Sequence, residues 1–439
     1  MVAVGTRLGL PAAFAVTALV AVVGRRPGPV AVCATLAVAS ASLGAHAWAS
    51  AVPRHLGPYT GWATVAADPL AVGSGTRLTL EVQHERFDAW AYGALAGKAM
   101  QRQAGELVWV AGERMVAPDP RGFARVRHVV GRFRLDVLAD VLPGSPLARA
   151  GNRVRGALQR AAAVSMSPHH AALFTGLVIG DDTRQPDWMV QQFRRAGLSH
   201  LTAVSGQNVA FLLAAALPLL RRLRPWWRWG ATVALIGWFM SITRFEPSVL
   251  RAGTMAALAA TAYVLGRDPR PVRLVSLAVI GLVLLDPLLA YSVGFWLSVG
   301  ATVGVCVVGP WCAARLPGPP WLRLSVGVTV GAQAGVLLPS LLAFGRVPLV
   351  SVAANLAAVP VAGFVMFYGL PAGLLASFLP PWAASAVMLP ATVGTRWTAT
   401  VAAVASSAEP SGAAAVVAWV AVGVAVAACA ILRRSCPRT

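Results

Sequence analysis

The sequence predicts an α-helical polytopic membrane protein that carries one small β-barrel domain near its N-terminus. Of its 439 residues, 57% are apolar and only 12% are charged, whereas soluble domains carry about 25% charged residues. Apolar segments of about 20 residues, the length that spans a bilayer as a helix, recur along the chain. The interval 54–140 instead shows alternating polar and apolar residues, the period of a β-strand.

The apolar segments predict about nine to eleven transmembrane helices. The candidate spans are residues 8–24, 30–50, 198–220, 229–243, 249–266, 273–291, 293–313, 322–343, 348–370, 372–390 and 412–432. The first two form a helix pair over residues 1–53 rather than a signal peptide, because no small-residue cleavage site precedes Arg25 and Arg26. These arginines lie in a very short loop, so the positive-inside rule places that loop in the cytoplasm and the following domain outside it.

Residues 54–140 predict a small domain of short antiparallel strands. Alternating runs at 76–82, 107–110 and 123–137 are separated by Gly, Pro and Asp. In the last run the apolar residues change parity at Gly131, which predicts a bulge or a sharp bend of the kind that long barrel strands need. The interval has about the size of an OB-fold, so we expect an OB-like domain.

Arginines and aromatic residues are interleaved near the end of this domain. OB-folds bind single strands by stacking bases on aromatic rings and by following the phosphates with basic groups. The candidate nucleic-acid-binding residues are Phe123, Arg125, Arg127, Arg132, Phe133 and Arg134. The alternative is an ordinary solvated strand face. The formal net charge of +21 fits both an anionic partner and positive-inside loops.

Residues 141–166 predict a basic amphipathic helix that lies along the membrane surface. Ser167 and the proline after it then open a helix that is too short to span a bilayer. Asp181 and Asp182 close this helix, and the polytopic channel domain occupies 167–435.

Polar residues crowd the start of the span at 198–220. His200, Ser205, Gln207 and Asn208 precede an apolar run, and the Ser-Gly pair among them can interrupt the helix. Polar groups at membrane depth are costly and usually face protein or a water-filled cavity. We therefore expect these side chains to point inward, onto water or a polar substrate. The alternative is hydrogen bonding that holds helices together.

Two further polar residues lie inside apolar segments. Arg251 costs about 2.5–3.5 kcal/mol at the bilayer centre on insertion scales, so it either contacts a substrate or pairs with a carboxylate such as Glu246 or Asp286. Asn355 lines a channel or joins two helices. Asp181, Asp182, His200, Ser205, Gln207, Asn208, Arg251 and Asn355 are the candidate residues of a substrate path.

The run LFTGLVIGDDTRQPDWMVQQFRRAGLSHLTAVSGQNVAFLL resembles the core of ComEC-type competence proteins. The resemblance lies in Gly180-Asp181, Phe193, Gly197 and the His-Leu-x-Ala-Val-Ser-Gly of residues 200–206. Further family motifs follow in the same order, namely PSVLRAGTM (247–255), DPLLAYSVGFWLSVGA (286–301) and FGRVPLVSVAANLAAVPV (344–361). The resemblance covers about 165–390. Gln207 and Asn208 stand where the family often has leucine and histidine, which weakens the transfer of a specific role to them.

The resemblance implies a multi-pass channel of the plasma (cytoplasmic) membrane that takes up single-stranded DNA during natural transformation, with its OB-like domain extracytoplasmic. It implies a DNA receptor, a cytoplasmic ATPase and a separate nuclease as partners. Many members carry a C-terminal metallo-β-lactamase-like domain, which we do not expect in this chain. None of the seven histidines forms a His-x-His-x-Asp-His arrangement and no phosphate-binding loop is visible, so we expect no metal, no cofactor and no enzyme activity.

Three other interpretations stay open. A transporter of another anionic solute or of a cell-wall precursor would also show interrupted spans. An intramembrane hydrolase would use Ser205 and His200, but the surrounding residues are not a nucleophile elbow, and side chains five residues apart on one helix do not face each other. The chain could also be a relative without transport activity.

Overall fold

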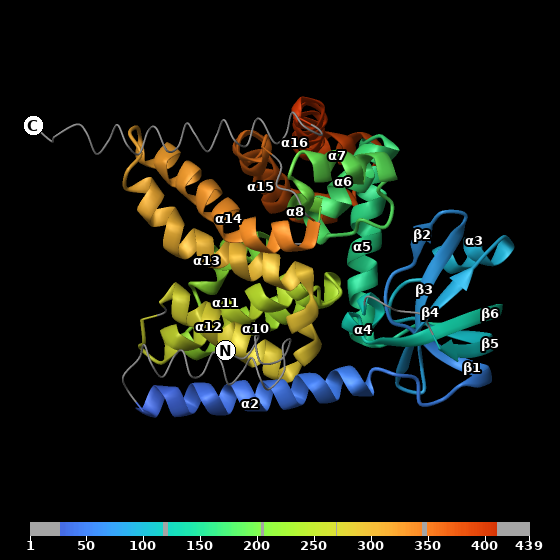
Figure 1. Ribbon diagram of the computed structural model, residues 1–439. Coiled ribbons are helices and arrows are strands. Elements are labelled where there is room, and N and C mark those ends of the chain that lie inside the picture. The colour runs from blue at the N-terminus through green and yellow to red at the C-terminus, as the bar shows by residue number, and fades with distance from the viewer. Residues whose placement is uncertain (1–26, 117–121, 203–205, 269, 345–348, 411–439) are drawn as a thin grey trace, which may run out of the picture.

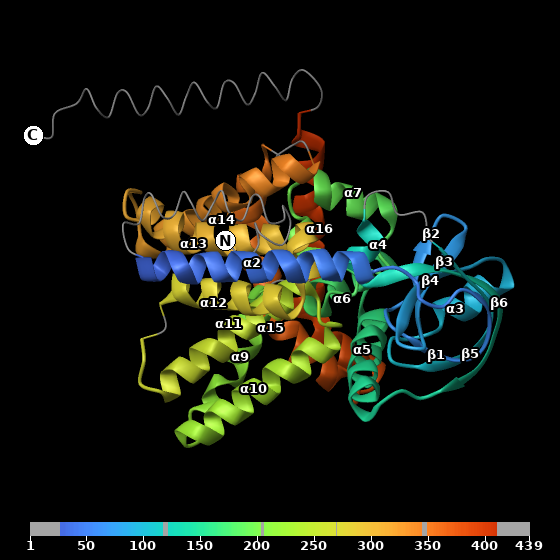
Figure 2. The same ribbon diagram turned by 60° about the horizontal axis from the view of Figure 1, so that its bottom comes forward.

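The computed structural model describes residues 27–116, 122–202, 206–268, 270–344 and 349–410. These form a β domain (residues 57–142) and a body of helices (Figure 1). The helix α2, Pro27–Ser50, runs along the body and leads into the β domain at its end (Figures 1 and 2). The predicted spans 8–24 and 412–432 lie outside the described residues.

The elements follow one another as long helices joined by short turns. The remaining helices are α3 Ala94–Met100, α4 Phe123–Val126, α5 Pro146–Ser165, α6 Pro168–Ile179, α7 Asp187–Arg195, α8 Ser199–Thr202, α9 Gly206–Leu220, α10 Pro225–Ile242, α11 Pro247–Val264, α12 Pro271–Leu285, α13 Val293–Ala313, α14 Pro320–Phe344, α15 Ser351–Ala376 and α16 Pro381–Ala408, with a 3-10 turn, η1, at Pro287–Tyr291. Many begin at proline, whose missing N–H is not needed in the first turn of a helix.

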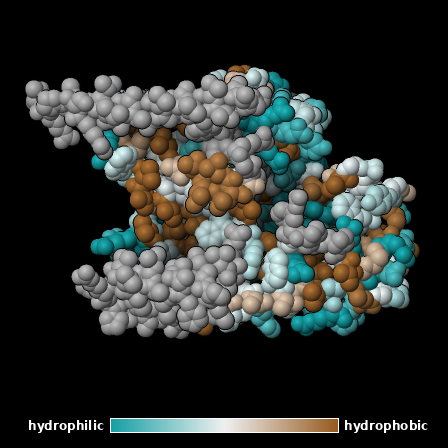
Figure 3. Space-filling view, viewed as in Figure 1, coloured by the Kyte–Doolittle hydropathy of each residue, from teal (hydrophilic) through white to brown (hydrophobic). Residues whose placement is uncertain are grey.

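Three of the described helices, α13, α14 and α15, are long and apolar enough to cross a membrane. Two shorter apolar helices, α9 and α12, accompany them. Large apolar side chains of α13 and α14 are exposed, and an apolar surface covers this part of the helical body (Figure 3). Such a surface fits a lipid environment.

The helices α13 and α14 form a tightly packed antiparallel pair. Gly300, Gly304 and Gly309 of α13 face Gly335, Gly331 and Gly327 of α14, and a Cβ added at Gly304 would clash with the carbonyl oxygen of Gly331. Small residues allow this close backbone approach, which in membranes is a main source of helix association. We call this contact the glycine seam.

The β domain is a six-stranded sheet with the order β1-β5-β6-β4-β3-β2. The strands are β1 Gly57–Val65, β2 Leu70–Val72, β3 Gly75–Val82, β4 Glu85–Ala91, β5 Leu107–Val116 and β6 Val129–Leu142. The strand β1 pairs with both β5 and β3, and the β4–β6 pair is parallel while the others are antiparallel. Inward-facing residues such as Leu78, Phe87 and Phe133 form one buried core.

The strand predictions at 76–82 and 107–110 are confirmed, but the single strand over 123–137 is wrong in its first half. Residues 123–126 form α4, and the strand begins only at Val129. The change of direction is made at two residues with positive φ, Gly122 (68°) and His128 (59°), which alternation cannot reveal. The predicted irregularity at Gly131 is confirmed, because the β4–β6 register shifts between Val129 and Gly131.

Two predicted spans run beyond the end of a helix. The segment 273–291 passes the end of α12 at Leu285 into η1, and 372–390 joins the end of α15 to the start of α16 across a turn at 377–380. The described parts of 198–220 lie in α8 and α9, and residues 203–205 are outside the described residues. Hydropathy cannot detect the turn at 377–380, because Ser377-Phe378-Leu379-Pro380 is itself mostly apolar. Consecutive prolines Pro380 and Pro381 mark the new helix start, since a residue before proline avoids the α conformation.

The glycine seam makes a testable prediction. Gly304→Val should destabilise the protein by about 1–3 kcal/mol or more, because the added side chain must push two backbones apart. Gly281→Val is the matched control, since an added Cβ there meets nothing within 4 Å. Both variants replace a glycine inside a helix by valine, so they differ only in the close contact. Thermal unfolding of the purified chain in detergent measures both variants, and equal unfolding temperatures would contradict the seam.

Candidate functional site

We call the polar residues predicted at the start of the span 198–220 the polar entrance, and part of it lies outside the described residues. His200 lies in the short helix α8, Ser205 lies outside the described residues, and α9 begins at Gly206. Asn208 is buried, and its Nδ2 donates to the carbonyl oxygens of Leu177 (3.0 Å) and Val178 (3.4 Å). Those carbonyls belong to the last turn of α6, where no intrahelical donor is available. The structure therefore gives Asn208 a helix-joining contact.

The next residues of α9 face α15. Phe211 and the amide of Gln207 both approach Gly363, where an added Cβ would lie 2.9 Å from the Phe211 ring and 3.4 Å from Gln207 Nε2. Close contact of the two helices thus depends on a glycine in the middle of α15. Gln207 is half-buried there.

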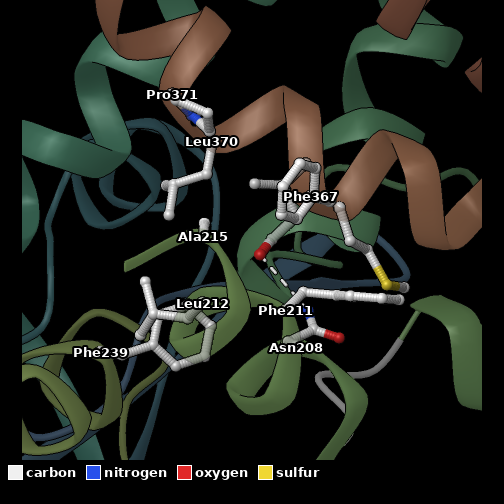
Figure 4. Close-up of a pocket in the computed structure, with 10 residues that line it drawn as sticks. Asn208, Phe211, Leu212, Ala215, Phe239, Phe367, Leu370 and Pro371 are labelled. Carbon is white, nitrogen blue, oxygen red and sulfur yellow. Dashed lines mark hydrogen bonds between the residues drawn. The ribbon is translucent and has the colours of Figure 1, made fainter. Parts of the chain in front are cut away.

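A small cavity lies between α6, α9, α10 and α15 (Figure 4). Its lining includes Asn208, Phe211, Phe239 and Leu370, and its volume is about 30 Å³. A cavity of this size can hold water but is far too small for a nucleotide. The walls are mainly apolar (Figure 4), so this contact between α9 and α15 is closed to a polar strand in the present conformation.

Arg251 is buried on α11 without a carboxylate partner in the described part of the chain. Its Nε and Nη2 donate to the Ser298 hydroxyl of α13 at 2.9 and 2.6 Å. The predicted pairing with Glu246 or Asp286 is not formed. An added Cβ at Gly206 would lie 3.3 Å from Arg251 Nη2, so the guanidinium lies directly against the start of α9.

Asn355 makes a contact within its own helix. Its Nδ2 donates to the carbonyl oxygen of Ser351 at 2.7 Å and lies 3.2 Å from the Ser351 hydroxyl oxygen. Ser351 in turn packs on Gly197, where an added Cβ would lie 2.6 Å from Ser351 Oγ. Both side chains are buried, and they fit the start of α15 against the turn between α7 and α8.

Charged residues gather where the β domain meets the helical body. Asp68, in the loop between β1 and β2, accepts hydrogen bonds from Arg155 of α5 (2.8 Å) and from Arg244 of the α10–α11 turn (3.0 and 2.8 Å). Arg155 is also 3.3 Å from the carboxylate of Asp181 at the end of α6. We call these four residues the junction cluster. Sequence reasoning found Asp181 but missed the other three.

The electrostatics of Asp68 follow from this environment. Burial by itself would raise the pKa of the Asp68 carboxyl, but the charges of Arg155 and Arg244, with the hydrogen bonds of Arg244 and the Ala104 amide, outweigh it and hold the pKa below its usual value. The carboxylate is therefore ionised and fully paired at neutral pH.

The two aspartates predicted for the path have different environments. Asp181 is buried and accepts from Gln159 Nε2 (2.8 Å) and the Thr183 hydroxyl (2.6 Å). Asp182 is exposed and lies close enough to Glu246 for its charge to act there. Glu246 keeps solvent-exposed surface, yet protein surrounds its other sides, and this desolvation and then the charge of Asp182 raise its pKa. A polar, solvent-reached region thus lies beside the start of α11.

The predicted residues of the β domain fall into different places. Phe123 is on α4, and the structure describes its backbone only. Arg125 stacks on Trp48 of α2 at 5.2 Å, and Arg127 donates to Asp88 at 2.6 Å. Both arginines therefore have structural partners.

The later residues of the same prediction lie along β6. The ring of Phe133 is buried in the core of the β domain. Arg134 is exposed and pairs with Glu113 (3.0 Å) and Asp136 (3.3 Å), while Arg132 is exposed.

An open groove of about 500 Å³ lies on the β domain at this point. It is lined by Trp90, Tyr92, Leu95, Met115, Arg132, Phe133, Arg134 and Leu135. Sequence reasoning missed Trp90 and Tyr92, although their alternation in DAWAY (88–92) places both on one strand face. Aromatic surface beside two arginines suits a ligand with flat rings and negative charge. We call this feature the groove.

One family model matches more than half of the chain. The model of the competence protein family, described as "Competence protein", matches residues 177–434. ComE operon protein 3 of Bacillus subtilis (strain 168) is 26% identical over 217 residues, covering 48% of this chain and 27% of that protein. Uncharacterized protein YcaI of Escherichia coli (strain K12) is 27% identical over 220 residues, covering 44% of this chain and 28% of that protein. No solved structure matches.

The junction cluster predicts that Arg155 of α5 contributes strongly to the stability of the fold. Arg155→Ala should lower the free energy of unfolding by about 3–5 kcal/mol, because it leaves Asp68 and Asp181 buried with too little positive charge. Arg134→Ala removes an exposed pair and should cost at most about 1 kcal/mol. Chemical unfolding of both variants in detergent compares them, and a loss for Arg155→Ala no larger than for Arg134→Ala would refute the cluster's importance.

Acid pH should weaken the same cluster. Since the folded pKa of Asp68 is depressed, its contribution to stability is present above the unfolded pKa and disappears as the pH falls through the folded pKa. Between about pH 5 and pH 3, the wild type should therefore lose more stability than Asp68→Asn, which has no carboxyl to protonate. Parallel unfolding curves of the two proteins over this range would contradict the expectation.

Proposed function

Because the chain belongs to the competence protein family, we propose that it is a channel of the cytoplasmic membrane that takes up single-stranded DNA during natural transformation. The observation that carries this proposal is the family match over residues 177–434, which contain α8, α9 and Arg251. The chain covers little more than a quarter of the two relatives named above, so the uptake activity itself is our proposal.

The distribution of arginines supports an extracytoplasmic β domain. The loops 221–224 and 314–319, and the described residues of the loop between α11 and α12, lie at the end of the helical body opposite the β domain (Figures 1 and 2). They carry Arg221, Arg222, Arg224, Arg267, Arg270 and Arg315. The positive-inside rule assigns short arginine-rich loops to the cytoplasm. The opposite end, where the turns at 243–246 and 286–292 contact the β domain, is then outside.

We infer that the β domain is an OB-like barrel. In support, β1 pairs with β5 at one end of the strand order and with β3 near the other, which brings the sheet round upon itself. The parallel β4–β6 pair and the helix α3 between β4 and β5 are further features of such a barrel. An extracytoplasmic OB-like domain would be the first part of the chain to meet incoming DNA.

We propose that the groove is the part of this domain that receives the strand. Tyr92 is 59% exposed, so its ring is free to stack on a base, and Arg132 offers a charge for the phosphates. Stacking contributes about 1–3 kcal/mol per base, and each phosphate contact adds a salt-dependent term. A transporter of another anionic solute would use the arginine but gain little from the exposed aromatic ring.

We also propose that the chain performs no chemistry on DNA. A DNA receptor, a cytoplasmic ATPase and a separate nuclease would then act with it, the ATPase or the proton gradient supplying the energy. These partners belong to the proposal, as does the membrane in which the chain is placed.

The test combines uptake and binding. A transformable bacterium that lacks its own channel should internalise labelled DNA when it expresses this chain, and Tyr92→Ala should lower the affinity of the purified full chain for single-stranded DNA by about 5- to 150-fold. Arg132→Ala should weaken binding less than Tyr92→Ala does. It should also lower the slope of the logarithm of the binding constant against the logarithm of salt concentration by about 1, as the loss of one phosphate contact does.

Arg86→Ala is the matched control, because Arg86 is on the same domain but outside the groove and pairs with Glu81. Equal DNA affinity of all three variants would refute the groove. Internalisation no greater than in cells without the chain would refute the channel, and flux of a small anion instead would favour the transporter.

A further inference from the structure

The turn between α10 and α11 has an unusual backbone. Two consecutive residues, Arg244 (φ 58°) and Phe245 (φ 54°), adopt the left-handed conformation, and neither is Gly, Asn or Asp. The left-handed conformation costs such a residue roughly 1–2 kcal/mol. It persists only where surrounding contacts determine it, and such outliers concentrate at functional and switching segments.

Backbone hydrogen bonds such as Phe245 N–H to the Met240 carbonyl (2.9 Å) close this turn, and side chains of the β domain and of α5 hold it from outside. The Arg244 guanidinium donates from Nε and Nη2 to the two carboxylate oxygens of Asp68, and Nη2 also donates to Asn152 of α5 at 2.7 Å. Asp68 is fixed in turn by the Ala104 amide at 3.0 Å and by Arg155. The side chains of Asp68 and Arg244 are only 15% and 18% exposed. Solvent therefore screens this bidentate ion pair only weakly.

The same turn positions the segment that reaches the polar entrance. α11 starts at Pro247, directly after the turn, and carries Arg251 and Ala252 in its first two turns. Both side chains lie against Gly206, where an added Cβ would be 2.9 Å from Ala252 Cβ and 3.3 Å from the Arg251 guanidinium. The first described residue of α9, Gly206, is therefore covered by the start of α11.

We propose that the Asp68–Arg244 pair is a latch through which the β domain holds α11 against the start of α9, and that a strand phosphate opens it by replacing the Asp68 carboxylate. The proposal rests on the proposed function for its ligand. Released from Asp68, the turn relaxes toward ordinary backbone conformations, and α11 withdraws from Gly206.

The chemistry of the pair favours phosphate as the competing group. A phosphate accepts the same two parallel N–H donors of a guanidinium as a carboxylate does. The turn lies on the β-domain side of the helical body, the side on which we propose the strand arrives. The β domain therefore couples arrival of DNA to withdrawal of α11 from the start of α9.

The test follows the exposure of position 252. Ala252→Cys, in a chain whose native cysteines are replaced by serine, is placed in lipid nanodiscs and labelled with a water-soluble maleimide. Asp68→Asn and Arg244→Ala should each raise the labelling rate by about tenfold. That is about the factor by which one ordinary residue disfavours the left-handed conformation at equilibrium. Arg134→Ala, which removes an exposed ion pair of the β domain outside the junction cluster, should label at the wild-type rate.

A second variant separates latch release from general loosening. Phe245→Gly removes most of the backbone cost at φ 54°, so the turn should keep its shape without the ion pair. Asp68→Asn combined with Phe245→Gly should then label close to the wild-type rate. Wild-type labelling of Asp68→Asn and Arg244→Ala, or failure of the glycine to restore it, would overturn the latch.

The ligand is tested in the same assay. Single-stranded DNA added to the wild-type background should raise the labelling rate of Ala252→Cys, while it leaves the rate of Arg244→Ala unchanged. An unchanged wild-type rate would overturn the role of the strand as the opening ligand. Because the labelling of the variants needs no DNA, a chain that fails to take up DNA still gives a decisive result for the latch.

Discussion

The Asp68 carboxylate joins the two parts of the chain through donors from three separate places: Arg155 of α5, Arg244 of the α10–α11 turn and the Ala104 amide of the β domain. Two arginines here face two aspartates, since Asp181 completes the cluster on the helical side. Removing charges from water costs several kcal/mol for each ion, which only complete pairing can offset. The charge balance of this cluster therefore helps to determine the position of the β domain.

This constraint explains why neighbouring arginines of α5 differ. Arg149, Arg153 and Arg160 share the helix with Arg155, but Arg155 is the one with 5% exposure and two carboxylate partners. α5 begins at Pro146 with a Ser145 cap, and helical spacing puts Arg155 on the same buried face as Gly151 and Leu158, but the sequence of α5 does not show which carboxylates it meets. The partner Asp68 is 87 residues away in a polar loop, where an aspartate is ordinary.

Sequence patterns predicted the parts of the fold that local physics controls. Apolar length located most long helices, and alternation located β3 and β5, because both depend on which face of one element is buried. The left-handed residues at Arg244, Phe245 and His128 could not be predicted, since they depend on distant partners. The same limit applies to the site: sequence placed Asn208 and Arg251 at membrane depth, but only tertiary structure shows that Asn208 caps α6 and that Arg251 meets Ser298.

The contacts of the helical body also indicate which helix a polar strand could displace most cheaply. The α13–α14 pair is joined backbone to backbone along the glycine seam, and separating it would expose close-packed surface with nothing to fill the gap. α9 is held differently, by Asn208 on carbonyls that the end of α6 leaves without donors, beside a cavity of about 30 Å³. Water can take over such end carbonyls at little cost. Moving α9 would therefore cost less than separating α13 from α14, and α9 is also the helix whose first described residue lies against Arg251.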